Sequence, residues 1–581
     1  MTTAIMPHII FVGEKWADSN PSFGISGSEH SFWKALDRYK EGTYEIIHFD
    51  EFFQENNQTA DKFLLERCAE TNPAFVFITW MFLPEEHLNP TLETLFTIET
   101  KMNIPVATWW GDSHLDSVFQ LAEMLAPFTT KTVVADSATN HIGKTKHPSR
   151  FFSFPIPTDS SIFFDAGNVR DIPVSFLGSI SHDGRNEFIE NIRAAGIEIF
   201  NQGGQREAKL TVEQYASYLQ RSAISLNILK KPFNAVNGRV FETTLSGALL
   251  LEPEWSEASH WFEPYAEFVP YSDVDDAIDK IRYYQNNDAE RIRIAKSGHD
   301  KAHLLYTSDG YWSRISEEIK AFERDSAALS AYAEIQINKE NYSQAIEILL
   351  DAENIDPNNF ENKIRLSECY IRCDKQGDAL SYIQQAKELS LDELIKNAHL
   401  ARIESLAGNV EATLEYAKRA LHYLGIDKTG FPCRLVGEAL IRIGSIEDGV
   451  TVFLHALSSE NQPATYMRLI KLLIETNLIQ FVPGLIPNYL ASEQIDPFVH
   501  LYLGSLMHKE GILNNSDFEQ WLSIGHAMIG EQELKRRILL AKFQGELRFA
   551  SSAIKSYLLL NPQSSVSRDL ELIQTEIRLA S

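Results

Sequence analysis

The chain has 581 residues, more than one ordinary domain of about 150 residues would use. Its 80 Asp and Glu against 53 Lys and Arg give a formal charge of −27, so a polyanion such as nucleic acid would be repelled. Four scattered cysteines are too few for a disulfide framework, and the sequence shows neither a signal peptide nor an apolar run of roughly 18 residues, so we expect a soluble cytoplasmic protein without a membrane segment.

Short apolar runs alternate with amphipathic stretches of helical length from residue 8 to about residue 320. The runs are rich in β-branched and aromatic residues and lie at 8–12, 44–49, 74–80, 105–109, 132–135, 173–177, 197–200, 224–228 and 248–251. This alternation predicts parallel sheets with helices on both faces, which is an α/β architecture.

Residues 141–164 interrupt this rhythm. The stretch contains Pro148, Pro155 and Pro157 and is locally basic. We interpret it as a linker between two α/β domains that have a crevice between them.

After about residue 326 the composition changes to Ala, Leu, Glu, Ile and Lys in helical periodicity. Small or apolar residues recur there with a period of 34, in four sets: Ala333, Ser367 and Ala401; Ala345, Ala379 and Thr413; Leu349, Ile383 and Ala417; Ala352, Ala386 and Ala420. A 34-residue helix-turn-helix period is typical of tetratricopeptide repeats. We therefore predict an all-α solenoid over residues 323–581, a type of surface that commonly binds peptides or proteins.

The loop after the first apolar run lacks the Gly-x-Gly-x-x-Gly pattern of a dinucleotide site, which argues against a dehydrogenase. Instead, Gly27, Ser28, Glu29 and His30 precede an amphipathic stretch. Small residues at a helix start leave N–H groups that can meet a phosphate or a sugar hydroxyl. A plain N-cap by Ser28 without a ligand explains the pattern equally well.

Polar residues follow two apolar runs of the second α/β domain. Gly178 and Ser179 form a turn after one run, Arg185 lies just inside the next expected helix, and Asn227 ends a later run. Open α/β sheets bind ligands at the carboxyl ends of their strands. These four residues are therefore candidates for a ligand site.

The stretch 239–253 places Arg239 and Glu242 ahead of Gly247 and a run of leucines. One interpretation is purely structural: the helix dipole favours a Glu in the first turn, and Gly247 ends the helix. The other is a polar site at the start of a helix, with a guanidinium that suits phosphate groups.

Taken in order, several motifs resemble the nucleotide-binding half of GT-B glycosyltransferases of the CgeB-like, group 1 type. They are Phe176-Leu177-Gly178-Ser179 with Arg185, Tyr215 ahead of Ser225-Leu226-Asn227, Arg239-Val240-Phe241-Glu242, Ser246-Gly247-Ala248 and Tyr271-Ser272-Asp273. The resemblance covers about residues 170–316 and implies two Rossmann-like domains, at 1–160 on the acceptor side and at 161–322 on the donor side.

The resemblance also implies roles for these residues. Glu242 would accept hydrogen bonds from the ribose of a nucleotide-sugar, Arg239 would face its diphosphate, and Gly247 would let the helix pack closely on the next strand. The sequence departs from the family at Asn234, where retaining members of the superfamily carry a Glu, so the stereochemistry stays open. Such enzymes need no metal, because helix N-termini and basic side chains stabilise the departing diphosphate.

An inverting mechanism would need a general base from the first domain. Asp112 and His114 follow the run at 105–109 and are the first candidates, and Glu29 and His30 are the next. An N-cap by Asp112 for a helix from about Leu115 is an equally good explanation of that residue.

Three functions fit the sequence. The first is a metal-independent bacterial glycosyltransferase that moves a sugar from a nucleotide-sugar to an acceptor, which is a protein recruited by the tetratricopeptide region. The second is a scaffold with a degenerate GT-B core and no catalysis, and the missing Glu at Asn234 favours it. The third, a sugar-nucleotide epimerase, shares the architecture but has no need of a long solenoid.

Overall fold

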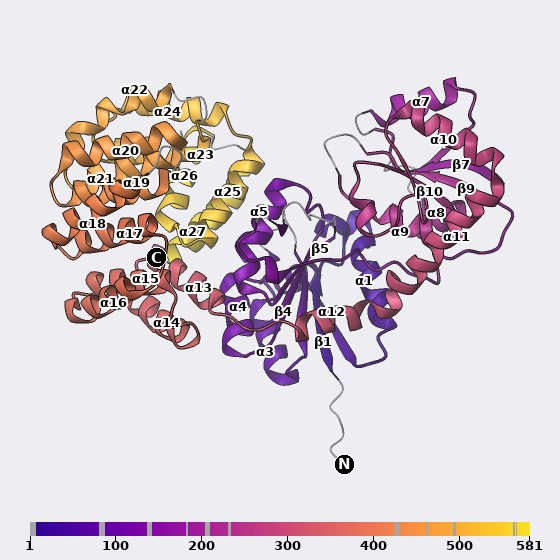
Figure 1. Cartoon of the computed structure of the whole chain (residues 1–581), viewed down its shortest axis with the longest axis horizontal. Coiled ribbons are helices and arrows are strands. Elements are labelled where there is room, and N and C mark those ends of the chain that lie inside the picture. Colours follow the sequence, from indigo (N-terminus) through magenta and orange to yellow (C-terminus); the bar gives the residue numbers. More distant parts are fainter. Residues whose placement is uncertain are drawn as a thin grey trace, which may run out of the picture. The chain divides into compact units, whose positions relative to one another are not determined.

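The computed structural model describes residues 7–80, 88–135, 142–143, 145–181, 184–203, 210–229, 234–424, 430–460, 463–491, 495–561, 564 and 566–580. The chain divides into two compact units, Met1–Arg324 and Asp325–Ser581. The first unit contains both sheets, and the second is helical (Figure 1). Among the helices described, none combines the length and the apolarity needed to cross a membrane.

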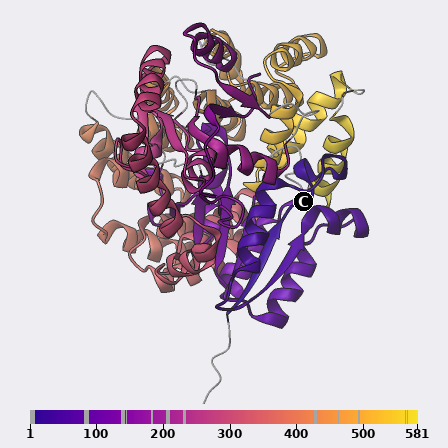
Figure 2. The same cartoon turned by 90° about the vertical axis from the view of Figure 1, so that its right-hand side faces the viewer.

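The first sheet has six parallel strands in the order β2-β1-β3-β4-β5-β6. Their bounds are β1 His8–Gly13, β2 Thr43–His48, β3 Phe75–Thr79, β4 Val106–Trp110, β5 Lys131–Val134 and β6 Phe151–Ser153. The central strands are buried along nearly their whole length because helices cover both faces, as the turned view in Figure 2 shows. This burial is why their sequences are almost continuously apolar.

Strand β6 corrects the interpretation of residues 141–164 as a linker alone. Phe151 pairs with Thr132 and Ser153 pairs with Val134, so the segment adds an edge strand to the first sheet. The strand is only three residues long and begins just after a 3-10 turn at Pro148–Arg150. A run this short carries no readable strand pattern, and only its pairing with β5 defines it.

The second sheet has five parallel strands in the order β11-β10-β9-β7-β8. Their bounds are β7 Ile172–Leu177, β8 Phe200–Gln202, β9 Ser222–Leu226, β10 Leu249–Pro253 and β11 Val269–Tyr271. Strand β8 begins at the last residue of the strand predicted at 197–200, and Ile197 and Ile199 ahead of it are buried in the core. The parallel α/β prediction is confirmed for both sheets.

Eleven α-helices are described in the first unit. They are α1 Gly27–Asp37, α2 Phe49–Asn56, α3 Asp61–Thr71, α4 Leu92–Phe96, α5 Asp116–Leu125, α7 Arg185–Ala194, α8 Val212–Arg221, α9 Gly238–Leu245, α10 Val274–Asn286, α11 Asp288–Leu305 and α12 Tyr311–Lys320. Helix α12 follows the second sheet in the chain but packs on the first. Its Trp312 is 1% exposed and meets the rings of Phe11 and Phe77 edge-on.

The second unit consists of antiparallel helix pairs (Figure 1). The helices are α13 Ala327–Asn338, α14 Tyr342–Ile355, α15 Phe360–Arg372, α16 Gln376–Glu388, α17 Glu393–Leu406, α18 Val410–Tyr423, α19 Gly430–Arg442, α20 Ile446–Glu460, α21 Pro463–Glu475, α22 Ile486–Leu490, α23 Pro497–Lys509, α24 Asn515–Ala527, α25 Glu531–Phe543, α26 Leu547–Leu560 and α27 Ser567–Ala580. All twelve small or apolar repeat positions are at most 2% exposed. The predicted helical region is therefore confirmed, while its assignment as a tetratricopeptide solenoid stays a prediction.

The turns between paired helices show that the period continues past residue 465, where the sequence pattern fades. A residue with positive φ occurs every 33 to 36 positions, at Glu340, Asp374, Gly408, Gly444, Asn477, Gly511 and Gly545. In each turn the following N–H donates to the carbonyl five residues earlier, at 2.7–2.9 Å. The backbone geometry thus repeats in the last units of the predicted helical region, where the side-chain pattern is too weak to show a period.

At these positive-φ turn positions, replacing a glycine should destabilise the protein and introducing a glycine should stabilise it. Gly408→Ala is expected to lower the free energy of unfolding by about 1 kcal/mol, because an L-residue with positive φ is strained. Asp374→Gly is expected to raise it by a similar amount. Space is open around the added Cβ at Gly408, so the effect reports the backbone alone.

The measurement is the midpoint of chemical unfolding for each variant. Gly377→Ala, inside α16 and also open to solvent, is the matched control and should stabilise by roughly 0.5–1 kcal/mol. A Gly408→Ala variant as stable as Gly377→Ala would contradict the assigned turn conformation.

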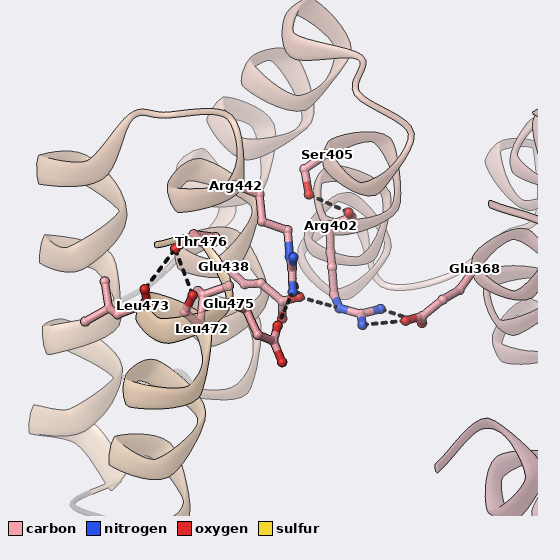
Figure 3. A network of polar contacts seen from close by, with 9 residues as sticks. All are labelled: Glu368, Arg402, Ser405, Glu438, Arg442, Leu472, Leu473, Glu475 and Thr476. Atoms are coloured by element: carbon pink, nitrogen blue, oxygen red, sulfur yellow. Dashed lines mark hydrogen bonds and ion pairs between the residues drawn. The ribbon is translucent and has the colours of Figure 1, made fainter. Parts of the chain in front are cut away.

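A ladder of ion pairs connects the first helices of successive pairs (Figure 3). Arg402 of α17 binds both carboxylate oxygens of Glu368 on α15, at 3.0 and 3.1 Å, and donates from Nε to Glu438 of α19 at 3.2 Å. Arg442 of α19 continues the ladder from Glu438 to Glu475 of α21, at 3.0 and 3.3 Å. The ladder therefore couples four helix pairs across their interfaces.

The last turns of the helical unit also contact its first pair. Asn338 donates to the carbonyl of Gln544 at 2.8 Å, and Arg548 pairs with Glu340 at 2.9 Å. A Cβ at Gly545 would lie 2.6 Å from the carbonyl oxygen of Ile335, so the backbones approach too closely for a side chain. The helix pairs of this unit thus complete one turn and meet.

Candidate functional site

Four of the predicted site residues lie together at the carboxyl ends of β7 and β9. Gly178 directly follows β7, and Asn227 directly follows β9. Arg185 is the first residue of α7, and Arg239 is the second residue of α9. The parallel sheet brings the starts of both helices to one edge, as the sequence predicted for an open α/β fold.

Both guanidinium groups are held by backbone carbonyls. Arg239 donates from Nε to Leu177 at 2.9 Å and from Nη1 to the side-chain oxygen of Asn227. Arg185 donates to the carbonyls of Ile228 and Ser179, both at 3.2 Å. The two groups lie 5.1 and 5.7 Å from the centre of the Phe176 ring.

The pair of guanidinium groups forms a concentrated positive charge. Within the described part of the chain, no carboxylate forms an ion pair with Arg185 or Arg239. Burial and the nearby charge of Arg239 both lower the pKa of Arg185. An anion placed between these groups would relieve that repulsion, so the cluster is suited to phosphate oxygens.

Gly178 is required by the approach of Arg239. A Cβ at this position would lie 2.5 Å from Nη2 of Arg239 and 3.6 Å from the Phe176 ring. Ser179, the next residue, bonds to Ser181 at 2.6 Å and keeps the turn tight. The Gly-Ser turn predicted from the sequence therefore leaves room for a guanidinium.

Glu242 lies on α9, one turn after Arg239. Its carboxylate accepts a hydrogen bond from Tyr215 of α8 at 2.8 Å, and burial raises its pKa. Arg239 is close enough to lower the pKa of both groups, against the larger effect of burial. Because Glu242 is the fifth residue of α9, the first-turn interpretation is wrong, and Asn237 provides the N-cap instead.

Gly247 is not part of this cluster. It follows the C-terminal end of α9, with φ +71, whereas Arg239 lies at the other end. A Cβ there would meet Arg170 at 2.6 Å and Asp165 at 2.8 Å. Its interpretation as the residue that ends the helix is the one that agrees with the geometry.

Glu252 belongs to the cluster and was missed by the sequence analysis. This residue of β10 is 0% exposed, and its carboxylate accepts from the amide of Asn227 at 2.8 and 3.0 Å. Burial raises the pKa of Glu252 to about 7. The available signal was a Glu directly after the apolar run 248–251, because a carboxylate that continues a buried strand is rare and often functional.

Asp112 and His114 lie after β4 of the first sheet. Asp112 has φ +50, a conformation that side chains seldom adopt, and its carbonyl accepts from Leu115 at 2.9 Å. Helix α5 begins only at Asp116, and its N-cap residue is Leu115. The alternative in which Asp112 caps this helix is therefore wrong. The positive φ of Asp112 is a strained backbone conformation, and such conformations are frequent at functional sites.

The predicted acceptor loop forms the first turn of α1. Gly27, Ser28 and Glu29 open the helix, and their side chains lie outside the described residues. The N-cap residue is Ser26, so the proposed cap by Ser28 is wrong. His30 meets the Trp33 ring edge-on at 6.1 Å and interacts electrostatically with Glu213 of α8.

No group of three His, Cys, Asp or Glu side chains placed to hold a metal is found in the described ranges. Cys68, Cys369 and Cys433 are buried and form no disulfide in the described part of the chain. That the proposed reaction needs no metal stays a prediction.

Part of the chain is similar to a known protein family. Residues 180–316 match a family model described as glycosyl transferase-like. A comparison with curated proteins gave no match. The matched segment contains Arg185, Asn227, Arg239, Glu242 and Glu252.

Several solved structures are similar to this chain at low identity and low TM-score. Anabaena Alr3699/HepE in complex with UDP and glucose has 11% identity and a TM-score of 0.39, over 54% of this chain and 100% of that one. A glycosyltransferase from Rickettsia africae has 12% identity and a TM-score of 0.39, over 54% and 99%. Sucrose-phosphate synthase from Thermosynechococcus elongatus has 8% identity and a TM-score of 0.37, over 54% of this chain and 97% of that one. The family model alone therefore shows that residues 180–316 are similar in sequence to a glycosyl transferase-like family.

Proposed function

We propose that the chain is a glycosyltransferase that takes a sugar from a nucleotide-sugar donor held by the second sheet. The observation that carries this proposal is the pair Arg185 and Arg239, two guanidinium groups that lie side by side at the strand ends of the glycosyl transferase-like segment. A donor diphosphate would supply the negative charge that the described carboxylates do not.

Within this proposal, Glu242 would bind the ribose hydroxyls of the donor. Its carboxylate already accepts from Tyr215, which leaves further lone pairs for a diol. Asp112 or His114 would supply the general base that deprotonates the acceptor hydroxyl. No catalytic metal is part of this mechanism, because Arg185 and Arg239 would balance the charge of the departing diphosphate.

The acceptor in this proposal is a protein recruited by the helical unit, in the cytoplasm of a bacterium. The support is the stack of helix pairs, because solenoids of this type present extended binding surfaces. The reaction and the recruitment can be tested separately, since donor binding does not require the acceptor.

The test is calorimetric titration of the full chain with UDP-, GDP-, ADP- and dTDP-sugars. One donor is expected to bind, and Glu242→Ala should weaken it by about 1.5–3 kcal/mol, because hydrogen bonds to a charged group are lost. Glu254→Ala, an exposed Glu after β10, is the matched control and should bind like the natural chain. Absence of binding across the panel would favour the scaffold over the enzyme.

A further inference from the structure

Glu252 is a buried carboxyl group with no cation bonded to it in the described part of the chain. It lies in β10 with 0% exposure, and its hydrogen-bond partners are the Asn227 amide, at 2.8 and 3.0 Å, and Ser256. Leaving a carboxylate in such surroundings is costly unless it is fully bonded. Because burial of this carboxylate destabilises the fold, a functional role would explain its presence.

Asn227 connects Glu252 to the guanidinium of Arg239. Its amide nitrogen donates to Glu252, while its amide oxygen accepts from Nη1 of Arg239 and from Asn237 at 3.3 Å. The backbone carbonyl of Asn227 accepts from Tyr271 at 2.6 Å, which fixes the residue itself. An ionised carboxylate can only accept, and a protonated carboxyl keeps its carbonyl oxygen as an acceptor. In both states Glu252 can therefore accept from the amide nitrogen of Asn227, which turns the amide oxygen toward Arg239.

We propose that Glu252 is a positioning residue of the donor site: it acts through Asn227 to orient Arg239, and it gains a proton when a diphosphate binds beside that guanidinium. The inference rests on the proposed function, because the anion is the diphosphate of the donor. Glu252 itself does not touch the donor, so its effect is transmitted by two hydrogen-bonded side chains.

The direction of the linkage follows from the charges that face Glu252. Burial raises the pKa of Glu252 to about 7, and Asn227, Ser256 and the charge of Arg239 partly oppose this effect. The phenol of Tyr271 on β11 also faces it, with Arg185 of α7 beyond. A bound diphosphate would offset the charge of Arg239 and raise the pKa further. By reciprocity the donor binds more tightly to the protonated form, so affinity falls as pH rises through about 7.

The first experiment counts protons during donor binding. The full chain is titrated with the nucleotide-sugar panel in buffers of different ionisation enthalpy, from about pH 6 to about pH 8. The phosphates of a nucleotide-sugar are diesters that do not titrate in this range, so proton uptake reports the protein. We expect uptake of a fraction of a proton near neutral pH and a several-fold loss of affinity toward the alkaline end.

Glu252→Gln is the decisive variant because Gln can still accept from Asn227 but cannot titrate. It should keep the affinity of the natural chain at the acidic end and lose both the proton uptake and the pH dependence. Glu254→Gln, two residues further on and exposed, should behave like the natural chain. Unchanged proton uptake in Glu252→Gln would overturn the proposal.

A second experiment needs no nucleotide. The Nε–H signal of Arg239, assigned by its loss in Arg239→Lys, should shift with pH in the natural chain, with a midpoint near that of Glu252. The pH-dependent shift should vanish in Glu252→Gln. It should also vanish in Asn227→Ala, which removes the side chain that connects Glu252 to Arg239 but keeps the carboxyl group of Glu252. A shift that persists in both variants would refute the positioning role even if a nucleotide-sugar binds. If the Arg239 signal shifts as expected but no nucleotide-sugar of the panel binds, the result would instead count against the proposed function.

Discussion

Arg402→Met is expected to lower the free energy of unfolding by about 3 kcal/mol, because it leaves Glu368 and Glu438 without their shared cation in largely buried surroundings. The side chains of Arg402 and Glu368 are only 21% and 15% exposed, so water screens them weakly. Removing one partner from such a ladder lowers the free energy of unfolding by more than the whole ladder contributes to it, since the remaining charges stay buried.

The measurement is the midpoint of urea unfolding of the full chain, followed by helical circular dichroism. Arg419→Met is the matched control, because Arg419 forms an exposed pair with Glu415 on α18, and such pairs contribute well below about 1 kcal/mol. Equal stability of the two variants would show that the ladder in Figure 3 contributes nothing.

The same ladder predicts a dependence on acid. Burial alone would raise the pKa of Glu368, but the charge and hydrogen bonds of Arg402 outweigh it, so the pKa lies below its usual value. A carboxyl with a depressed folded pKa stabilises the protein above its unfolded pKa, and this stability is lost as the pH falls through the folded value. The difference between the natural chain and Arg402→Met should therefore shrink below about pH 4.

Arg239→Ala is expected to weaken nucleotide-sugar binding by about 3 kcal/mol, on the order of 100-fold, if the proposed donor site is correct. The guanidinium is held by Leu177 and Asn227 and is free to bond phosphate oxygens with its remaining N–H groups. Its loss would also leave the amide oxygen of Asn227 with only the longer hydrogen bond from Asn237, at 3.3 Å, so the site would lose both charge and order.

Gly178→Ala probes the same site without removing a charge. The added Cβ would lie 2.5 Å from Nη2 of Arg239, which must move, so we expect roughly a tenfold loss of affinity. Arg193→Ala is the control, because this exposed residue of α7 pairs with Glu190. Calorimetric titration of the three variants is the check, and natural affinity in Arg239→Ala would place the donor elsewhere.

Local patterns in the sequence were sufficient for much of the architecture. Continuous apolar runs predicted the parallel strands, because strands buried on both faces carry such runs. A period of 34 predicted the helix pairs, because small residues recur where helices approach. Gly178, Arg185, Asn227 and Arg239 came together for a topological reason, since the carboxyl ends of parallel strands meet at one edge.

Contacts between distant segments were decided by the tertiary structure alone. Strand β6 exists because β5 offers it an edge, and α12 returns to the first sheet because Trp312 fits among the rings of that core. The buried carboxyl of Glu252 is meaningful only beside Asn227, which lies 25 residues earlier in the chain. Pairings of this kind depend on how the chain is brought together in space, and no periodicity within one segment encodes them.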